Sequence, residues 1–188
     1  MTSQAFTEHQ IVPDVIDQPP TQTATVTYPK AKVNLGNEIG PVNVRQQPQV
    51  TYPAEKNAYY TLIMTDPDAP SRTSPDRKEA RHWLVGNIPG SDVSKGQVIS
   101  AYIGSGPPQG SGLHRYIFLI YQQPGKITFD EKHESETEMG ERMSFVVRKF
   151  TEKYKLVLKA GNFYQAQYDD SVPELHKQLG FTAPAADV

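Results

Sequence analysis

Four short, almost entirely apolar runs constrain the fold of this chain more than any other feature of its sequence. They cover residues 59–65 (YYTLIMT), 83–88 (WLVGNI), 98–103 (VISAYI) and 116–121 (YIFLIY). Each run has the length of a β-strand, is rich in β-branched and aromatic residues and is followed by turn-forming or polar residues. Such runs predict strands that lie deep in a core. Residues 23–28 (TATVTY) and 160–168 predict two more strands, and residues 126–129 a short edge strand.

The periodicity changes in the second half of the chain. Between residues 142 and 154, apolar side chains recur at helical spacing, which predicts a helix lying on the sheet with Arg142 among the charged residues of its solvated face. A second short helix is predicted at 173–179, with proline near its start. Residues 11–16 are expected to form an amphipathic turn, and residues 1–10 to be polar and mobile.

These elements predict a mainly β protein, with six or so strands and few helices, arranged as an antiparallel-rich β-sandwich. A length of 188 residues suits one domain spanning residues 1–188. The formal net charge of -2 and the scattered basic residues argue against nucleic-acid binding. Cysteine is absent, which excludes disulfides and fits a reducing compartment. With no signal peptide and no apolar run of membrane-spanning length, we expect a soluble, cytoplasmic monomer.

Charged and aromatic side chains cluster where the predicted core strands end. Asp66 and Asp68 follow the first apolar run in the turn DPDAP, where Pro70 favours a tight turn that can hold a cis bond to Ala69. His82 and His114 each begin a later strand. If these strands are neighbours, Asp66 and the two histidines meet at one end of the sandwich.

The loop at residues 104–116 (GSGPPQGSGLHRY) has four glycines and two prolines. Glycine lets backbone N–H groups approach a ligand, and successive N–H groups can form a concavity that binds an anion. The loop matches neither the P-loop nor the dinucleotide-binding fingerprint, so a nucleotide is not indicated. Recognition of a small anion is the functional interpretation, and a plain connection between strands is the alternative.

Together these residues carry a resemblance to a known family. The segments TDPDAPSR (65–72), HWLVGNIPG (82–90), the glycine-rich loop and YQAQYDD (164–170) resemble the phosphatidylethanolamine-binding protein family, also called the Raf kinase inhibitor protein family. The similarity in order and spacing extends over about residues 12–179. It implies a β-sandwich with a small anion pocket at one end, partly closed by a C-terminal helix.

The resemblance also implies which residues form the pocket and which support it. The expected ligand-binding residues are Asp66, His82, Gly106, Pro108, His114 and Tyr116. The expected supporting residues are Asp68, Pro70 and Arg115. At the pocket rim this chain departs from the family: Arg77 and Ala80 stand where aromatic residues are usual, and His176 stands where an aromatic lid residue is common. The loss of the aromatic residue at Ala80 is expected to open or reshape the rim.

The function implied is non-catalytic recognition of a phosphate-type anion or phospholipid headgroup, with no metal or cofactor. The expected role is to modulate or inhibit a signalling kinase or a protease. One alternative is a metalloenzyme, because Asp66, His82 and His114 form the ligand set of a facial triad. A weaker alternative is a serine hydrolase using Ser105 or Ser111, although no GxSxG motif is present.

Overall fold

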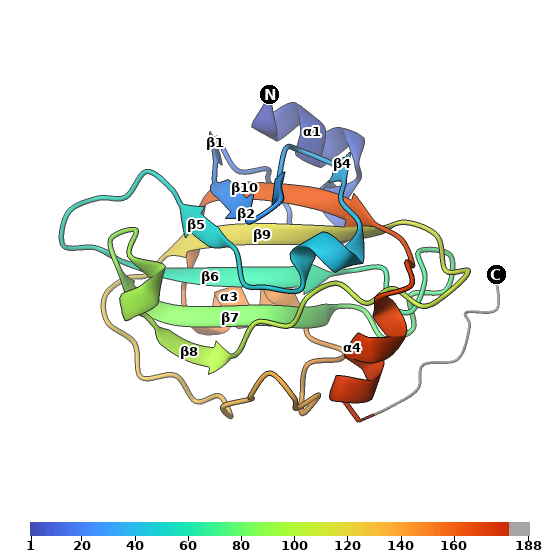
Figure 1. Cartoon of the computed structure of the whole chain (residues 1–188). Helices are drawn as coiled ribbons and strands as arrows, with labels where there is room; N and C mark the ends of the chain where they lie inside the picture. Colours follow the sequence, from blue (N-terminus) through green and yellow to red (C-terminus); the bar gives the residue numbers. More distant parts are fainter. Residues whose placement is uncertain (181–188) are drawn as a thin grey trace.

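The larger of two β-sheets runs through the middle of the protein, and the computed structural model describes residues 1–180 (Figure 1). Its strands are antiparallel, except that β1 and β4 each pair in parallel with β10. In spatial order they are β1 (Gln22–Thr23), β10 (Val157–Ala166), β9 (His114–Gln122), β6 (Tyr59–Asp66), β7 (Ala80–Pro89) and β8 (Gln97–Ser100), with β4 (Asn37–Glu38) also beside β10.

Each face of this sheet is covered by a different layer. One face packs against a three-stranded sheet, whose order is β3 (Ala31–Lys32), β2 (Thr25–Tyr28) and β5 (Gln49–Thr51). The opposite face is covered by α1 (Thr2–Glu8), α2 (Ile11–Asp14) and α3 (Val147–Lys153). Helix α4 (Val172–Gln178) lies at one end of the sheet, and two short 3-10 helices, η1 (Pro41–Val44) and η2 (Val93–Lys95), lie in connections (Figure 1). The predicted mainly β fold with a C-terminal helix is confirmed.

The continuous apolar runs are explained by burial on both faces of the sheet. Successive side chains of a strand point to opposite faces. In β6, Leu62 and Met64 therefore enter the core shared with the small sheet, whereas Ile63 packs under the helices. In β9, Ile120 faces the small sheet, and Leu119 faces the helices. A strand with a solvated face would instead alternate apolar and polar residues.

The N-terminus differs from the sequence-based prediction. Residues 1–10 were expected to be polar and mobile, but Thr2–Glu8 is helical and Phe6 is fully buried. The Phe6 ring packs edge-on against Phe163, with 5.1 Å between ring centroids. Burial of a phenylalanine side chain stabilises a fold by about 1.5–3 kcal/mol, which is enough to anchor a short helix that local sequence does not favour.

Two predictions in the second half also need correction. The helix expected at 142–154 is shorter, because α3 spans only Val147–Lys153. Arg142 precedes it in irregular chain and is buried, not solvated, because its guanidinium donates hydrogen bonds to backbone carbonyls. The edge strand expected at residues 126–129 is not formed; Ile127 instead bonds the side chain of Asn87.

The sheet register brings the polar strand ends together. Asp66, the last residue of β6, lies opposite Ala80, the first residue of β7. On the other side of β6, Thr65 pairs with Ile117 of β9, so His114 begins β9 near the same end. Because β6 has both β7 and β9 as neighbours, this end of the sheet gathers residues that are far apart in the sequence.

Candidate functional site

A cavity of about 810 Å³ opens at this end of the sheet. It lies between the ends of β6, β7 and β9, the glycine-rich loop, the segment before α3, and α4. Of the ligand-binding residues expected from the sequence, the structure brings all six to this one cavity: Asp66, His82, Gly106, Pro108, His114 and Tyr116. The rim residues Arg77, Ala80 and His176 line it too, and so does Pro70, whose bond to Ala69 is cis.

Asp66, His114 and Ser111 form a hydrogen-bonded chain, of which Asp66 and His114 line the cavity. His114 Nδ1 lies 2.8 Å from Asp66 Oδ2, and His114 Nε2 lies 2.9 Å from Ser111 Oγ. Ser111 Oγ donates its hydrogen to the Pro108 carbonyl at 2.6 Å, so Nε2 must be the donor to Ser111. The Asp68 amide donates to the other Asp66 oxygen at 2.7 Å. Both His114 nitrogens therefore carry hydrogens, and neither is available to a ligand.

The protonation state of His114 follows from these contacts. Its burial disfavours the charged form, but the adjacent Asp66 carboxylate outweighs that effect and raises the pKa of His114 above its ordinary value. The imidazolium and the carboxylate then neutralise each other. Asp66 is thus compatible with an anion site, because its negative charge is already compensated by His114.

His82 is held in a different way. Its Nδ1 donates to the Ile103 carbonyl at 2.9 Å, and no described residue bonds its Nε2. Burial lowers the pKa of His82, although Asp66 acts in the opposite direction. The ring stands edge-on to Tyr116, with 5.3 Å between centroids. At neutral pH His82 is therefore an uncharged ring whose Nε2 accepts a hydrogen bond, and on protonation it becomes a donor.

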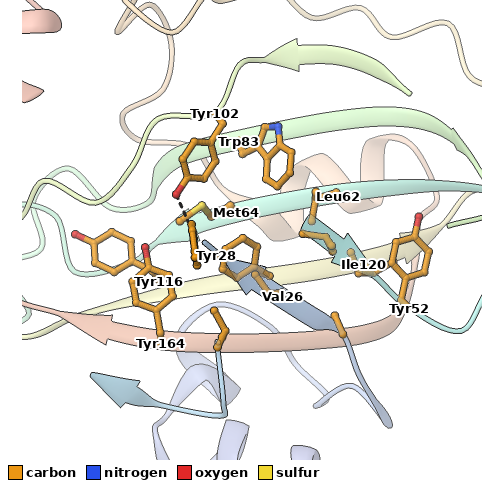
Figure 2. Close-up of a cluster of buried hydrophobic side chains, with 14 of the residues drawn as sticks. Val26, Tyr28, Tyr52, Leu62, Met64, Trp83, Tyr102, Tyr116, Ile120 and Tyr164 are labelled. Carbon is orange, nitrogen blue, oxygen red and sulfur yellow. Dashed lines mark hydrogen bonds between the residues drawn. The ribbon is translucent and has the colours of Figure 1, made fainter. Parts of the chain in front are cut away.

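Tyr116 is held in a stack of rings below the cavity. Its ring lies parallel to His114 and to Tyr164, at centroid distances of 6.1 Å and 5.2 Å. Figure 2 shows Tyr116 and Tyr164 together at one end of the core, close to the hydrogen-bonded pair of Tyr28 and Tyr102. Burial raises the pKa of Tyr116, so its hydroxyl stays protonated. A tyrosine hydroxyl can both donate and accept hydrogen bonds. The Tyr116 hydroxyl bonds the Ser105 side chain, and it can form a further hydrogen bond with a ligand.

Arg142 is a site residue that the sequence analysis missed. Its side chain is 2 % exposed, lines the cavity and donates to five backbone carbonyls, those of Arg81, His82, Ala101, Ser135 and Glu138. No carboxylate of residues 1–180 forms an ion pair with it. Burial lowers the pKa of Arg142 to about 10, so it remains charged at neutral pH. The role of Arg142 follows from the carbonyls that surround it in the folded chain, and no local sequence pattern indicates those contacts.

A second buried arginine at the cavity is neutralised within the protein. Arg81 Nη2 pairs with Glu134 Oε1 at 2.7 Å, and Ser100 Oγ donates to the same carboxylate oxygen at 2.8 Å. The guanidinium also lies over the Phe145 ring. Glu134 forms its ion pair with Arg81 and also attracts Arg142, so one buried carboxylate faces two buried guanidinium groups.

Asp68 and Arg115 form a brace behind the cavity. Arg115 Nε and Nη2 bond the two Asp68 carboxylate oxygens at 2.9 and 2.7 Å, and Nη1 bonds Asp14 at 2.9 Å and the carbonyl of His9 at 2.9 Å. Neither Asp68 nor Arg115 is among the described residues that line the cavity. This pair ties the DPDAP turn and the start of β9 to the N-terminal helices.

Gly106 is needed for close packing against α4. A Cβ at this position would lie 2.9 Å from Leu175 Cδ2 and 3.2 Å from His176 Nε2. The Gly106 carbonyl also accepts a hydrogen bond from His176 Nε2 at 2.9 Å. The cradle of N–H groups stays a prediction, and the structure adds that the missing side chain at Gly106 lets α4 approach the loop.

The rim departures have distinct structural consequences. Ala80 is buried, faces Asp66 across the β6–β7 pair and lines the cavity with only a methyl group. Arg77 is exposed, and its backbone N–H donates to the Ala69 carbonyl at 3.0 Å. The small side chain at Ala80 leaves space in the cavity that an aromatic ring would fill.

The metalloenzyme alternative does not fit this geometry. Within residues 1–180, no group of three or more His, Cys, Asp or Glu side chains is arranged to hold a metal ion. His114 spends one nitrogen on Asp66 and the other on Ser111, so it has no lone pair for a metal. A facial triad needs a free nitrogen on each histidine.

The hydrolase alternative is closer in geometry but also fails. Ser111, His114 and Asp66 are connected in the order of a catalytic triad, at 2.9 and 2.8 Å. However, the Ser111 hydroxyl donates to the Pro108 carbonyl, and Ser111 is not among the described residues that line the cavity. A nucleophile must instead pass its proton to the histidine and face the substrate. Ser105 is fully buried against Tyr164.

Comparison with known proteins establishes the family. The family described as "Phosphatidylethanolamine-binding protein" matches residues 3–163, which is most of the chain. The chain belongs to this family. Its members are generally non-catalytic binding and inhibitor proteins, as the sequence resemblance implied.

This family member resembles known proteins both in sequence and in structure. "Putative odorant-binding protein A5" of Drosophila melanogaster is 39% identical over 174 residues, covering 92% of this chain and 83% of the relative. A carboxypeptidase Y inhibitor, solved in complex with its cognate proteinase, has a TM-score of 0.79 at 27% identity, covering 89% of this chain and 95% of that one.

A more distant structure supports the fold alone. The phosphatidylethanolamine-binding protein of Plasmodium vivax has a TM-score of 0.73 at 20% identity, covering 90% of this chain and 98% of that chain. Among the helices of residues 1–180, none is long and apolar enough to cross a membrane.

Proposed function

We propose that this protein binds a phosphate-type anion, free or as a phospholipid headgroup, in the cavity at the end of β6, β7 and β9. The observation that carries the proposal is the positive charge of Arg142, which forms no ion pair among the described residues and lies beside His82, whose carbonyl it contacts at 3.2 Å. All five Arg142 N–H donors bond backbone carbonyls, so Arg142 attracts an anion through its charge and not as a hydrogen-bond donor. A buried cation without a carboxylate partner is costly unless an anion approaches it. The Tyr116 hydroxyl supplies a hydrogen bond that orients the ligand, and His82 Nε2 supplies another when the ring is protonated.

The arrangement of charges supports an anion and not a cation. The negative charge of Asp66 is compensated by His114, and that of Glu134 by Arg81. Asp68 is compensated by Arg115 behind the cavity. The exposed rim adds one charge of each sign, Asp76 and Arg77. Arg142 is the buried cation at the cavity that forms no ion pair among the described residues, and a low local dielectric makes its field stronger than in water.

The test is a titration of backbone amide and histidine-ring NMR signals with inorganic phosphate and with phosphoethanolamine. We expect saturable shifts at His82, Tyr116 and residues 104–116. Tyr116→Phe keeps the stacked ring and removes the hydroxyl, so it should weaken binding by roughly three- to tenfold, the usual value of one hydrogen bond. Tyr52→Phe is the matched control, because the Tyr52 hydroxyl bonds the Gly90 carbonyl away from the cavity. Absence of saturable shifts at these residues would refute the anion site.

We further propose that ligand binding serves the regulation of a partner protein, either a kinase or a protease. The protease alternative has specific support, since the carboxypeptidase Y inhibitor shares this fold at 27% identity and was solved bound to its cognate proteinase. Inhibition assays with carboxypeptidase Y and with a Raf-type kinase, each with and without saturating phosphoethanolamine, test this proposal. Unchanged activity of both enzymes at micromolar concentrations of the protein would contradict it.

A further inference from the structure

Arg81 has hydrogen-bond donors that the protein itself does not use. A guanidinium group carries five N–H donors. Among the described residues, the Arg81 side chain forms one hydrogen bond, from Nη2 to Glu134 Oε1 at 2.7 Å. Its Nε is buried without a hydrogen-bond partner, and no other buried side-chain nitrogen or oxygen of residues 1–180 is in that condition. Because nearly all buried polar groups in proteins are bonded, an orphaned donor on a residue of the cavity indicates a ligand contact.

The Nη1 atom of Arg81 is unbonded as well, but it is accessible. Within residues 1–180, no group accepts a hydrogen bond from Nη1. Nε is the one unbonded side-chain atom of these residues that is fully enclosed, so Nη1 keeps contact with solvent. Arg81 lines the cavity and is only 5 % exposed, so the cavity is the space that Nη1 faces.

Arg142 lies next to Arg81 and has the opposite balance of charge and donors. All five of its N–H donors are engaged by backbone carbonyls, whereas its charge has no ion-pair partner among the described residues. The Arg81 amide donates to the Arg142 carbonyl at 2.8 Å, and Arg142 Nη1 donates to the Arg81 carbonyl at 3.3 Å. One arginine therefore has charge to spare, and its neighbour has donors to spare.

The Arg81 guanidinium is fixed in position by two neighbours. Its Cζ lies 4.9 Å from the centre of the Phe145 ring, which supports one face of the group. Glu134, which holds Nη2, is itself fixed by Ser100 Oγ at 2.8 Å and by the Glu141 N–H. A donor that is oriented before a ligand arrives loses little conformational entropy on binding.

We propose that Arg81 donates hydrogen bonds from Nη1 to the anion in the cavity, and that Arg142 attracts the same anion through its charge alone. This inference rests on the proposed anion site and names the arginine that contacts its ligand directly. Hydrogen bonds from an ionised donor to an anion are about twice as strong as those between neutral groups. The contact therefore contributes more to affinity than the Tyr116 hydroxyl does.

The first experiment makes the same substitution at both arginines and measures phosphate affinity by calorimetry. Arg81→Lys keeps a cation that can pair with Glu134 but loses the planar set of donors, so it should weaken phosphate binding about tenfold or more. Arg142→Lys keeps the charge, which is all that this residue supplies, and should change the affinity less than about threefold. Arg148→Lys, at a residue outside the cavity, is the control and should leave the affinity within about twofold of wild type.

A free phosphate and a lipid headgroup present the same oxygen atoms to Arg81, so the titrations are repeated with glycerophosphoethanolamine. This molecule is the headgroup without its apolar chains. The source that the site serves is the probe that the wild type binds more tightly, and the affinity for that probe should fall in Arg81→Lys.

NMR of the arginine side chains observes the contact directly. In the wild type, saturating phosphate should shift the Nη signals of Arg81 and slow the rotation of its Nη1 group. Arg115 is the internal control, because its Nε, Nη1 and Nη2 already bond Asp68, Asp14 and the His9 carbonyl. A purely structural role of Arg81 would lower the stability of Arg81→Lys but would leave these wild-type signals unchanged when phosphate is added.

The outcomes separate this inference from the anion site on which it rests. Phosphate binding that is equally tight in the wild type and in Arg81→Lys would overturn the inference and leave the anion site intact. A loss in Arg142→Lys without a loss in Arg81→Lys would make Arg142 the donor and also overturn it. Absence of saturable phosphate binding by the wild type would overturn both proposals. If Arg81→Lys does not fold, the wild-type NMR titration decides, since Arg81 signals that phosphate leaves unchanged overturn the inference.

Discussion

The two sides of the cavity are built on opposite principles. On the side of β6 and β9, Asp66, His114 and Ser111 satisfy one another, and Asp68 and Arg115 brace them from behind. On the β7 side, His82 has an unbonded Nε2 and Arg142 has charge without a carboxylate partner among the described residues. The closed side holds the shape of the cavity, whereas the open side offers a ligand the unbonded Nε2 of His82 and the charge of Arg142, whose own N–H donors are all bonded to carbonyls. His82 and His114 both lie near strand ends at the same cavity, but their different hydrogen bonds give them different functions.

The largest effect is expected from breaking the brace of the closed side. Asp68→Ala leaves Arg115 buried with only Asp14, which is half-exposed, as an ion-pair partner among the described residues. Loss of one partner of a buried ion pair should lower the free energy of unfolding by about 3–5 kcal/mol. Urea denaturation measures this change. Asp92→Ala, which removes an exposed pair with Lys95, is the control and should cost less than about 1 kcal/mol. Equal effects of the two variants would contradict the brace.

The open side should lose anion affinity when its cation is removed. Arg142→Met should weaken phosphate binding at least tenfold, or ~1.4 kcal/mol, and also destabilise the segment whose carbonyls Arg142 bonds. Arg142→Lys retains the charge but not the planar fork of donors. Lysine should therefore keep most of the affinity while showing reduced stability. If both variants bind phosphate equally well, the charge of Arg142 is not what attracts the anion.

His114 should give the closed side a stability that depends on pH. Because its pKa is raised in the folded protein, its contribution is fully present below the unfolded-state value of about 6.5. The contribution is lost as the pH rises through the higher folded-state pKa. The difference in unfolding free energy between the wild type and His114→Gln should therefore shrink as the pH rises above about 6.5. A difference that grows with pH would show that the pair is not ionised.

The pKa of His82, on the open side, is shifted in the opposite direction from that of His114, and we expect its effect in the pH dependence of anion binding. Its lowered pKa means that it gains a proton only as the pH falls below about 6.5. Below that pH the lowered pKa of His82 by itself disfavours the folded state, but a bound anion favours the protonated ring. Sulfate, which keeps its charge in this range, should bind more tightly at pH 5.5 than at pH 7.5. The gain should be absent in His82→Gln, and its persistence there would assign the titration to another group.

The smallest effect is expected at the rim. Arg77 is exposed at the edge of the cavity, where solvent and salt screen its charge. Arg77→Ala should change phosphate affinity by less than about twofold at physiological ionic strength. A tenfold loss would show that Arg77 closes over the ligand and would extend the open side beyond Arg142.

Much of the site could be predicted because its signals are local. Asp66, His82 and His114 stand at the ends of apolar runs, and the glycine-rich loop lies directly before His114. The separation of their roles could not be predicted, since it depends on which hydrogen bonds each ring makes across the sheet. His114 was expected to donate to a ligand, but both of its nitrogens are engaged within the protein.

The missed elements share one physical cause. The local pattern around Phe6 indicates mobile chain, but packing against Phe163 fixes the position of Phe6. The local pattern around Arg142 indicates a solvated helix face, but its hydrogen bonds to the distant Arg81 and Ala101 carbonyls fix its position. Local propensity is weak against burial of an aromatic ring or satisfaction of buried carbonyls.

By itself, the sequence determined the long core strands, their deep burial and the placing of acidic and imidazole groups at strand ends, because these depend on periodicity and on neighbours along the chain. The tertiary structure alone decided which charges are compensated. Asp66 meets His114 and Glu134 meets Arg81 across long sequence separations, and Arg142 is left without a carboxylate among the described residues. Charge compensation is a property of distances between strands and loops, and only the folded chain sets those distances.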